Sequence, residues 1–230
     1  SVNICEELGR IGYLLTDKTG TLTKNDMEMR KIHMGTISFE TDSSASEIRN
    51  NLMLAAVKLK SNSFSAEHLL SQDQHHFMTG RGRRDIHYRL FDVAQALAVC
   101  HNVTPSFEEN EMFYQASSPD EVAIVKWTEN VGMTLYYRDR ERIKLRLGDD
   151  DELLEFEILH LFPFTSESKR MGILVRDFQT NEIIFYQKGA DSVMGQIVQK
   201  SDWLDEECGN MAREGLRTLV IGRKKLSEAE

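Results

Sequence analysis

Cysteine and proline are both scarce in this chain of 230 residues, which contains three of each. The cysteines, Cys5, Cys100 and Cys208, are odd in number and show no Cys-x-x-Cys spacing. This pattern argues against a disulfide framework and against a zinc site, and it favours a reducing compartment. With few prolines to mark boundaries, helices and strands must be predicted from hydrophobic periodicity.

Long apolar runs and a surplus of basic residues are also lacking. No stretch approaches the roughly 18 consecutive apolar residues that a membrane-spanning helix needs. The 28 Lys and Arg against 37 Asp and Glu give a net charge of −9, which argues against a nucleic-acid-binding protein. The Gly-x-x-x-x-Gly-Lys-Ser/Thr loop is absent, which excludes a P-loop NTPase. Hydrophobic residues make up 40% of the chain, enough for a sizeable core.

Periodicity predicts an α+β domain, an antiparallel sheet with flanking helices. Helical spacing covers residues 50–60, 84–99, 119–132, 190–199 and 202–214, and strand-like alternation covers 143–147, 154–158, 171–177, 183–187 and 217–221. Short turns between neighbouring strands favour antiparallel pairing. Residues 61–83 offer few large apolar side chains and are expected to be flexible.

The most specific chemistry lies in residues 17–23, Asp-Lys-Thr-Gly-Thr-Leu-Thr. The apolar residues 11–15 before them predict a short buried strand, the first of an incomplete α/β unit. A carboxylate at the end of such a strand, Asp17, can act as a nucleophile and form an aspartyl-phosphate. Since two anions meet in that attack, a Mg²⁺ ion is required. The alternative is a simple polar turn after a strand. Any four of these residues alone would favour the turn, but the complete set of seven favours the phosphorylation site.

Three further segments contain residue types suited to a nucleotide. In residues 162–171, FPFTSESKRM, the Phe164 ring can stack on a purine and Lys169 can reach phosphate oxygens. Lys188 and Gly189 stand at a strand end, and Arg217 follows a Gly-Leu pair. Each segment also has an explanation without a ligand. Residues 162–171 can be a core aromatic followed by a solvated loop, Lys188 and Gly189 can form a simple turn, and Arg217 can make a surface salt bridge.

Glu121 has two explanations as well. It is the fourth residue of Ser118-Pro119-Asp120-Glu121, a capping box with proline at the first helical position. In that motif its side chain bonds the backbone N–H of Ser118, and this explanation ranks first. In the second explanation the Glu121 carboxylate lies at a binding site and contacts the bound ligand.

Residues 17–23 match the phosphorylation signature of P-type ATPases in full. They are also similar to the Asp-x-Asp motif of haloacid-dehalogenase-type phosphatases, but Thr19 replaces the second aspartate, which favours an ATPase. The resemblance implies catalytic roles for Asp17, Lys18 and Thr19, with Asp17 and Thr19 at an Mg²⁺ site. That site is incomplete because the family's Thr-Gly-Asp and Gly-Asp-Gly-x-Asn-Asp motifs do not appear.

The same resemblance implies an ATP site. Phe164 would stack on adenine, Lys188 would line the base pocket, and Lys169 and Arg217 would address the phosphates. The complete implied set of nucleotide-binding residues is Glu121, Phe164, Ser166, Lys169, Lys188, Gly189 and Arg217.

Longer blocks resemble the type IV P-type ATPases, the phospholipid flippases. These are Cys100-His101-Asn102-Val103, the YQASSPDEVA of residues 114–123 and FPFTSESKRM; residues 127–129 and 207–217 look most like the branch without an accessory β-subunit. The resemblance implies ATP and Mg²⁺ as cofactors, a phospholipid substrate bound by a separate membrane domain, and a monomeric fragment. It also implies the cytosolic domain of an integral membrane protein of the Golgi, endosomes or plasma membrane.

The domain organisation implied by the resemblance has three parts. Residues 1–28 would begin a phosphorylation domain of α/β hydrolase type, 29–224 would form a nucleotide-binding domain with a flexible insertion at 41–84, and 225–230 would be a return linker. Two alternatives remain: a cation-transporting P-type ATPase, or a nucleotide-binding module that is not catalytic in isolation.

Overall fold

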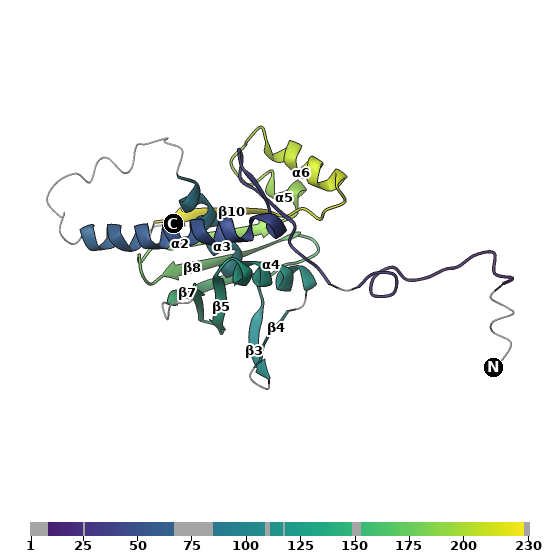
Figure 1. Ribbon diagram of the computed structural model, residues 1–230, viewed down its shortest axis with the longest axis horizontal. Helices are drawn as coiled ribbons and strands as arrows, with labels where there is room; N and C mark the ends of the chain where they lie inside the picture. The colour runs from purple at the N-terminus through teal and green to yellow at the C-terminus, as the bar shows by residue number, and fades with distance from the viewer. Residues whose placement is uncertain are drawn as a thin grey trace.

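The computed structural model describes residues 9–24, 26–66, 85–108, 111–116, 118–148 and 153–227. Its centre is a six-stranded antiparallel sheet in the order β10-β9-β8-β7-β6-β5 (Figure 1). The strands are β5 (Met133–Arg138), β6 (Arg142–Leu147), β7 (Leu153–Phe162), β8 (Arg170–Asp177), β9 (Ile183–Gly189) and β10 (Val220–Leu226). Each pairs with its neighbour in sequence, and this arrangement confirms the predicted α+β class.

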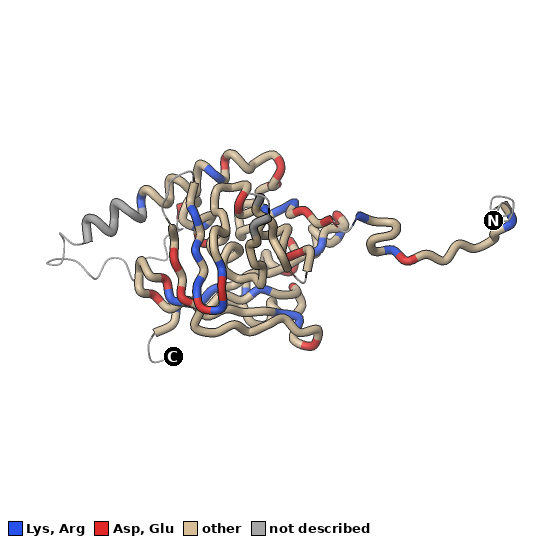
Figure 2. Tube along the Cα trace, turned by 90° about the horizontal axis from the view of Figure 1, so that it is seen from below, with Lys and Arg blue, Asp and Glu red and all other residues tan. Residues whose placement is uncertain are grey.

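The sheet has one apolar and one charged face because side chains alternate along each strand. Ile143 and Leu145 of β6 are fully buried. On the other face, Lys144 Nζ lies 2.7 Å from Glu155 Oε1 of β7. Figure 2 shows Lys and Arg beside Asp and Glu on neighbouring strands. The apolar face therefore has to be covered by helices.

Three helices cover that face (Figure 1): α2 (Thr41–Ala66), α3 (Ile86–Val99) and α4 (Pro119–Asn130). α3 lies between the other two and also contacts β5 and β10. Its buried residues Leu90, Ala94 and Leu97 recur at helical spacing, as the sequence predicts. Among the described helices, none is both long and apolar enough to cross a membrane.

α2 corrects the expectation of a flexible insertion over residues 41–84. Ile48, Leu52 and Ala55 are fully buried against the core, so the first half of that segment is part of the domain. The helix continues to Ala66, beyond the predicted end at residue 60. Residues 67–84 lie outside the described part of the chain.

Several boundaries also differ from the prediction. Hydrophobic periodicity did not predict β5 or two hairpins, β1 (Lys31–His33) with β2 (Ser38–Glu40) and β3 (Thr104–Glu108) with β4 (Glu111–Gln115). The helix predicted over 190–199 is reduced to α5 (Asp191–Met194), followed by α6 (Leu204–Arg213). β10 begins at Val220, so Arg217 lies before the strand and not at its predicted start. The strand continues to Leu226, into the segment predicted as a linker.

Residues 11–15 do not form the predicted buried strand. They are extended but belong to no described sheet, and Tyr13 and Leu15 are 92% and 96% exposed. A strand requires a neighbour for its backbone hydrogen bonds, and no described segment supplies one. Figure 1 shows this segment leading away from the folded body.

Candidate functional site

Four charged side chains from three distant segments meet at the start of α4. Glu121 Oε1 lies 2.6 Å from Lys188 Nζ at the end of β9. The neighbouring Asp120 accepts a hydrogen bond from Arg217 of the segment between α6 and β10. We refer to Asp120, Glu121, Lys188 and Arg217 as the charged corner.

Lys188 lies near the end of β9, the strand between β8 and β10 in the sheet. It lies opposite Met171 of β8 and Ile221 of β10, and the residue is only 4% exposed. Although its ammonium is in ion-pair contact with Glu121, the contact lacks hydrogen-bond geometry, and no other described group accepts from Nζ. A buried ammonium with unsatisfied N–H donors is costly, so this position favours an incoming acceptor.

Gly189 and Lys169 are brought together by close strand packing. A Cβ atom on Gly189 would lie 2.6 Å from Lys169 O, so only glycine allows this approach. Ala190 N–H donates to the same Lys169 oxygen at 3.0 Å. Lys169 itself adopts a left-handed backbone with φ of 50°, which turns the chain into β8. The backbone of Lys169 therefore lies directly beside the residue that follows Lys188.

Phe164 and Ser166 belong to the loop of residues 163–169, which joins β7 to β8 at this end of the sheet. The loop is closed by its own hydrogen bonds: Thr165 Oγ1 to Ser168 Oγ at 2.8 Å, and Lys169 N–H to Thr165 O at 2.8 Å. Phe164 is nevertheless 61% exposed. The sheet thus presents an uncovered aromatic ring on a closed loop at the end where Lys188 and Gly189 lie.

Glu121 does not act as the predicted capping-box residue. Ser118 is the N-cap of α4 but makes no side-chain cap hydrogen bond. Glu121 Oε2 instead accepts from the backbone N–H of Asn102 at 2.7 Å, and its other oxygen faces Lys188. The capping geometry is lost because a buried cation and a free N–H compete for the same carboxylate.

The chain matches no family model. It is 52% identical to phospholipid-transporting ATPase NEO1 of Saccharomyces cerevisiae, over 98% of this chain and 19% of that protein. It is 51% identical to "Probable phospholipid-transporting ATPase tat-5" of Caenorhabditis elegans, over 100% of this chain and 20% of the relative. The chain belongs to the family of phospholipid-transporting ATPases. Phospholipid-transporting ATPase neo1 of Schizosaccharomyces pombe is 46% identical, again over 100% of this chain and 20% of its own length. The chain spans about a fifth of the length of the relatives it matches.

The turn of residues 100–103, which contacts Glu121 through Asn102, and Arg138 of β5 form a buried polar cluster. His101 Nδ1 accepts from Val103 N–H at 3.0 Å and from Arg138 Nη1 at 3.1 Å. Because both donors address Nδ1, the ring carries its proton on Nε2, which donates to Ala98 O at 2.8 Å. Burial, followed by the charges of Arg138 and Lys188, holds the pKa of His101 well below its usual value, so the ring is neutral.

Burial also shifts the pKa values of Arg138 and Cys100, which lie next to His101. Burial lowers the pKa of Arg138 to about 10, while the charge of Glu121 opposes that shift. Burial also raises the pKa of the Cys100 thiol to about 12. Cys100 is the C-cap residue of α3 and is fully buried.

Asp17, Lys18 and Thr19 are not brought to the charged corner. They lie in the extended segment and are exposed; the Asp17 carboxylate accepts only the adjacent Lys18 N–H, at 2.8 Å, among the described groups. No group of three or more His, Cys, Asp or Glu able to hold a metal occurs in the described part of the chain. Asp17 and Thr19 alone do not provide enough ligands for Mg²⁺.

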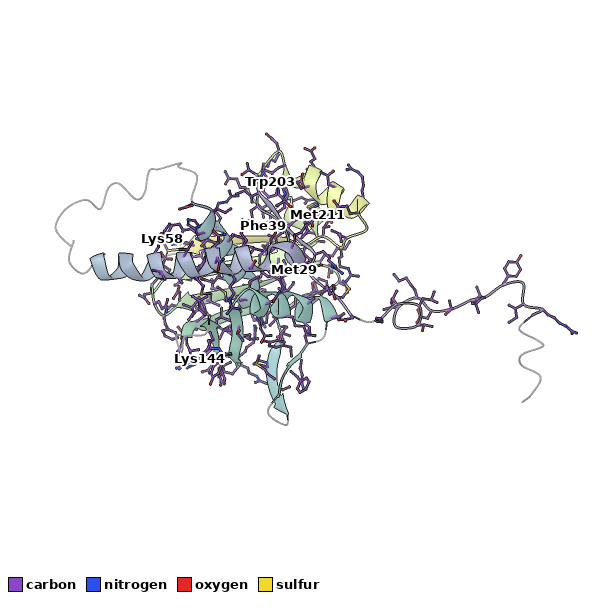
Figure 3. All side chains as sticks on the ribbon, in the orientation of Figure 1. Met29, Phe39, Lys58, Lys144, Trp203 and Met211 are labelled. Atoms are coloured by element: carbon purple, nitrogen blue, oxygen red, sulfur yellow. The ribbon has the colours of Figure 1, made fainter. Side chains whose placement is uncertain are left out.

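A cavity of about 990 Å³ adjoins the charged corner. Asp120, Lys188 and Arg217 are among the residues that line it, whereas no residue of the 163–169 loop does. Its wall is largely apolar, and three of the lining residues, Met29, Trp203 and Met211, are labelled in Figure 3. Phe164 does not line this cavity, so Lys188 stands between the cavity and the end of the sheet that carries the 163–169 loop.

Sequence reasoning missed four residues of the site: Asp120, His101, Asn102 and Arg138. Asp120 stood in the predicted capping box, beside Glu121, and could have been suspected from its position. Arg138 carried no signal, because a cation at a strand end is ordinarily solvated.

Proposed function

We propose that this chain binds ATP with its base on Phe164 and its phosphates toward Arg217. The observation that carries the proposal is the buried Lys188 ammonium, whose donors are unsatisfied, at the same end of the sheet as the exposed Phe164 ring. An aromatic face and a donor of fixed position are what a purine base requires. The resemblance to P-type ATPases assigns the same residues.

Each residue of the proposed site has a role set by its own geometry. Phe164 supplies a stacking face on a closed loop, and Lys188 donates to an acceptor on the base edge, with Glu121 holding the ammonium in place. Gly189 keeps the strand end free of a side chain, and Ser166 offers a hydroxyl on the exposed loop. Lys169 and Arg217 provide positive charge for the phosphates.

We further propose that the chain acts within a longer phospholipid-transporting ATPase, as the names of its relatives suggest. In that protein the Asp17 carboxylate would attack the γ-phosphorus of ATP, with Lys18 and Thr19 beside it, forming an aspartyl-phosphate as the bond to the β,γ-bridging oxygen breaks and ADP leaves. Phosphorylation would drive movement of a phospholipid between leaflets. Mg²⁺ would shield the charges that meet in this step, but the remaining ligands are not among the described residues. The chain would lie on the cytosolic side of a Golgi, endosomal or plasma membrane, as a monomer without a β-subunit.

Backbone NMR titration of the 230-residue chain with ATP tests the binding site. We expect a dissociation constant on the order of 1 mM, because one stack and a few exposed charges offset only part of the entropy of association. Mg²⁺ should hardly strengthen binding, and ADP should bind within a few-fold of ATP. Shifts should cluster at Phe164, Lys188, Gly189 and Arg217.

The deciding comparison is between two exposed phenylalanines. F164A should abolish the shifts, whereas F178A, at a ring 49% exposed in the turn between β8 and β9, should leave them unchanged. Normal binding by F164A, or shifts centred on Asp17, would show that the site has been assigned wrongly.

A further inference from the structure

Arg138 is a buried cation that the proposed ATP site does not use. It ends β5 and is only 8% exposed. Its guanidinium donates to His101 Nδ1, and no carboxylate pairs with it directly in the described part of the chain. Burying a cation without a carboxylate partner costs free energy, so the contact of Arg138 with His101 is the place to look for its role.

A continuous chain of contacts leads from Arg138 to Lys188. The guanidinium bonds the His101 ring, whose tautomer is fixed by Val103 N–H and Ala98 O. The next residue, Asn102, donates its backbone N–H to Glu121 at 2.7 Å. Glu121 is then in contact with the Lys188 ammonium at 2.6 Å. Each link is short, and three of the five residues are buried.

Positive charge exceeds negative charge along this series of contacts from Arg138 to Lys188. Arg138 and Lys188 are both cationic and buried, and the Glu121 carboxylate acts on both: it contacts Lys188 and its charge raises the pKa of Arg138. His101 is neutral. Glu121 contacts the Lys188 ammonium directly but acts on Arg138 only through its charge, so the position of its carboxylate affects both cations.

We propose that Arg138 is a positioning residue for the base site: through His101 it fixes the turn from which Asn102 holds Glu121, and Glu121 in turn holds Lys188. The inference rests on the proposed function for its effect on ATP, but the chain of contacts itself does not. Arg138 does not touch the nucleotide. Its removal changes where the Glu121 carboxylate, and with it the Lys188 ammonium, is held.

The test uses R138M and R138K in the 230-residue chain, with ATP as the probe. R138M should weaken ATP binding about fivefold, and R138K, which keeps the charge and a donor toward Nδ1, should stay within about twofold of wild type. L145A, which creates a cavity at a fully buried position of β6, controls for lost stability and should bind ATP as wild type does. All measurements are made well below the melting temperature of each variant.

Two readouts separate positioning from general structure. In an E121Q background R138M should have no further effect on ATP binding, because Arg138 acts through Glu121. The hydrogen bond to Glu121 should shift the Asn102 amide proton downfield and protect it from exchange, and both effects should be lost in R138M but not in L145A. Multiplicative losses in the double variant, or an unchanged Asn102 amide, would overturn the inference. Failure of the wild-type chain to bind ATP would overturn the proposed function instead, and the Asn102 amide would still decide the role of Arg138.

Discussion

Arg217 and Asp120 are 97 residues apart in sequence and form an ion pair at the charged corner. The cation that we assign to the phosphates is therefore already paired with a carboxylate of the same domain. Arg217 is 66% exposed and Asp120 is 23% exposed, so the pair is weak enough to be exchanged. Phosphate binding must compete with Asp120.

Removing that competitor should strengthen ATP binding. In D120N the carboxylate charge is lost, so Arg217 is free to turn toward the phosphates and a like charge is removed from their vicinity. Since an exposed pair contributes up to about 1 kcal/mol, we expect a gain of about two- to fivefold in ATP affinity by NMR titration. Adenosine, which has no phosphate, should bind D120N as it binds wild type.

The matched control for D120N is E182Q, which removes the charge of a carboxylate paired with Lys225 elsewhere on the sheet. It should leave the affinity for ATP unchanged. An equal gain for adenosine in D120N would argue that the base site, and not Arg217, had changed.

Lys188 should be more important for stability than a surface lysine. In K188M the Glu121 carboxylate, which is 15% exposed, loses its cation, and we expect the free energy of unfolding to fall by about 3 kcal/mol. Urea unfolding of K188M, E121Q and the double variant forms a complete cycle. The double variant should be less destabilised than the sum of the single variants, by at least about 1 kcal/mol. Strict additivity would mean that the two groups are not coupled.

Gly189 tests the close approach of β8 to β9. In G189A the new methyl group would lie 2.6 Å from Lys169 O and 2.7 Å from Arg170 Cβ, both part of a paired strand end. We expect a loss of about 1–3 kcal/mol of unfolding free energy. G209A, inside α6 and 3.7 Å from the flexible Arg213 side chain, should instead stabilise by about 0.5–1 kcal/mol. Thermal or urea unfolding compares them directly, and a tolerated G189A would contradict the observed packing.

His101 should make the domain less stable in mild acid. Its pKa in the folded state lies well below the ordinary value of 6.5, so below that pH the unfolded chain binds a proton at this residue that the folded chain does not. The unfolding free energy therefore falls as the pH falls from 7.5 to 5.5.

H101N provides the comparison for that pH dependence, since the Asn oxygen can replace Nδ1 as an acceptor but does not titrate. Its stability deficit relative to wild type should shrink toward pH 5.5 in urea unfolding. A deficit that stays constant from pH 7.5 to 5.5 would show that His101 takes up its proton in the folded state.

Local periodicity was enough to predict much of the fold. Residues 143–147 and 154–158 alternate strictly and form β6 and β7, and the apolar spacing of residues 84–99 gives α3. β5 was missed because Leu135, Tyr136 and Tyr137 are apolar in succession, with a register shift at the bulge between them. The segment 11–15 was misjudged for the opposite reason: its apolar residues indicate a strand, but a strand exists only where a neighbour pairs with it.

The sequence by itself determined which motifs the chain carries, and the prediction of nucleotide-binding residues, Phe164, Lys188, Gly189 and Arg217, rests on the composition of those motifs. Only the tertiary structure decided what these residues contact. The contacts of Glu121 with Asn102 and Lys188, the pairing of Asp120 with Arg217 and the burial of Arg138 against His101 join segments far apart in the chain. Charge pairing and burial depend on distance in space, and the one-dimensional order of the residues does not contain that distance.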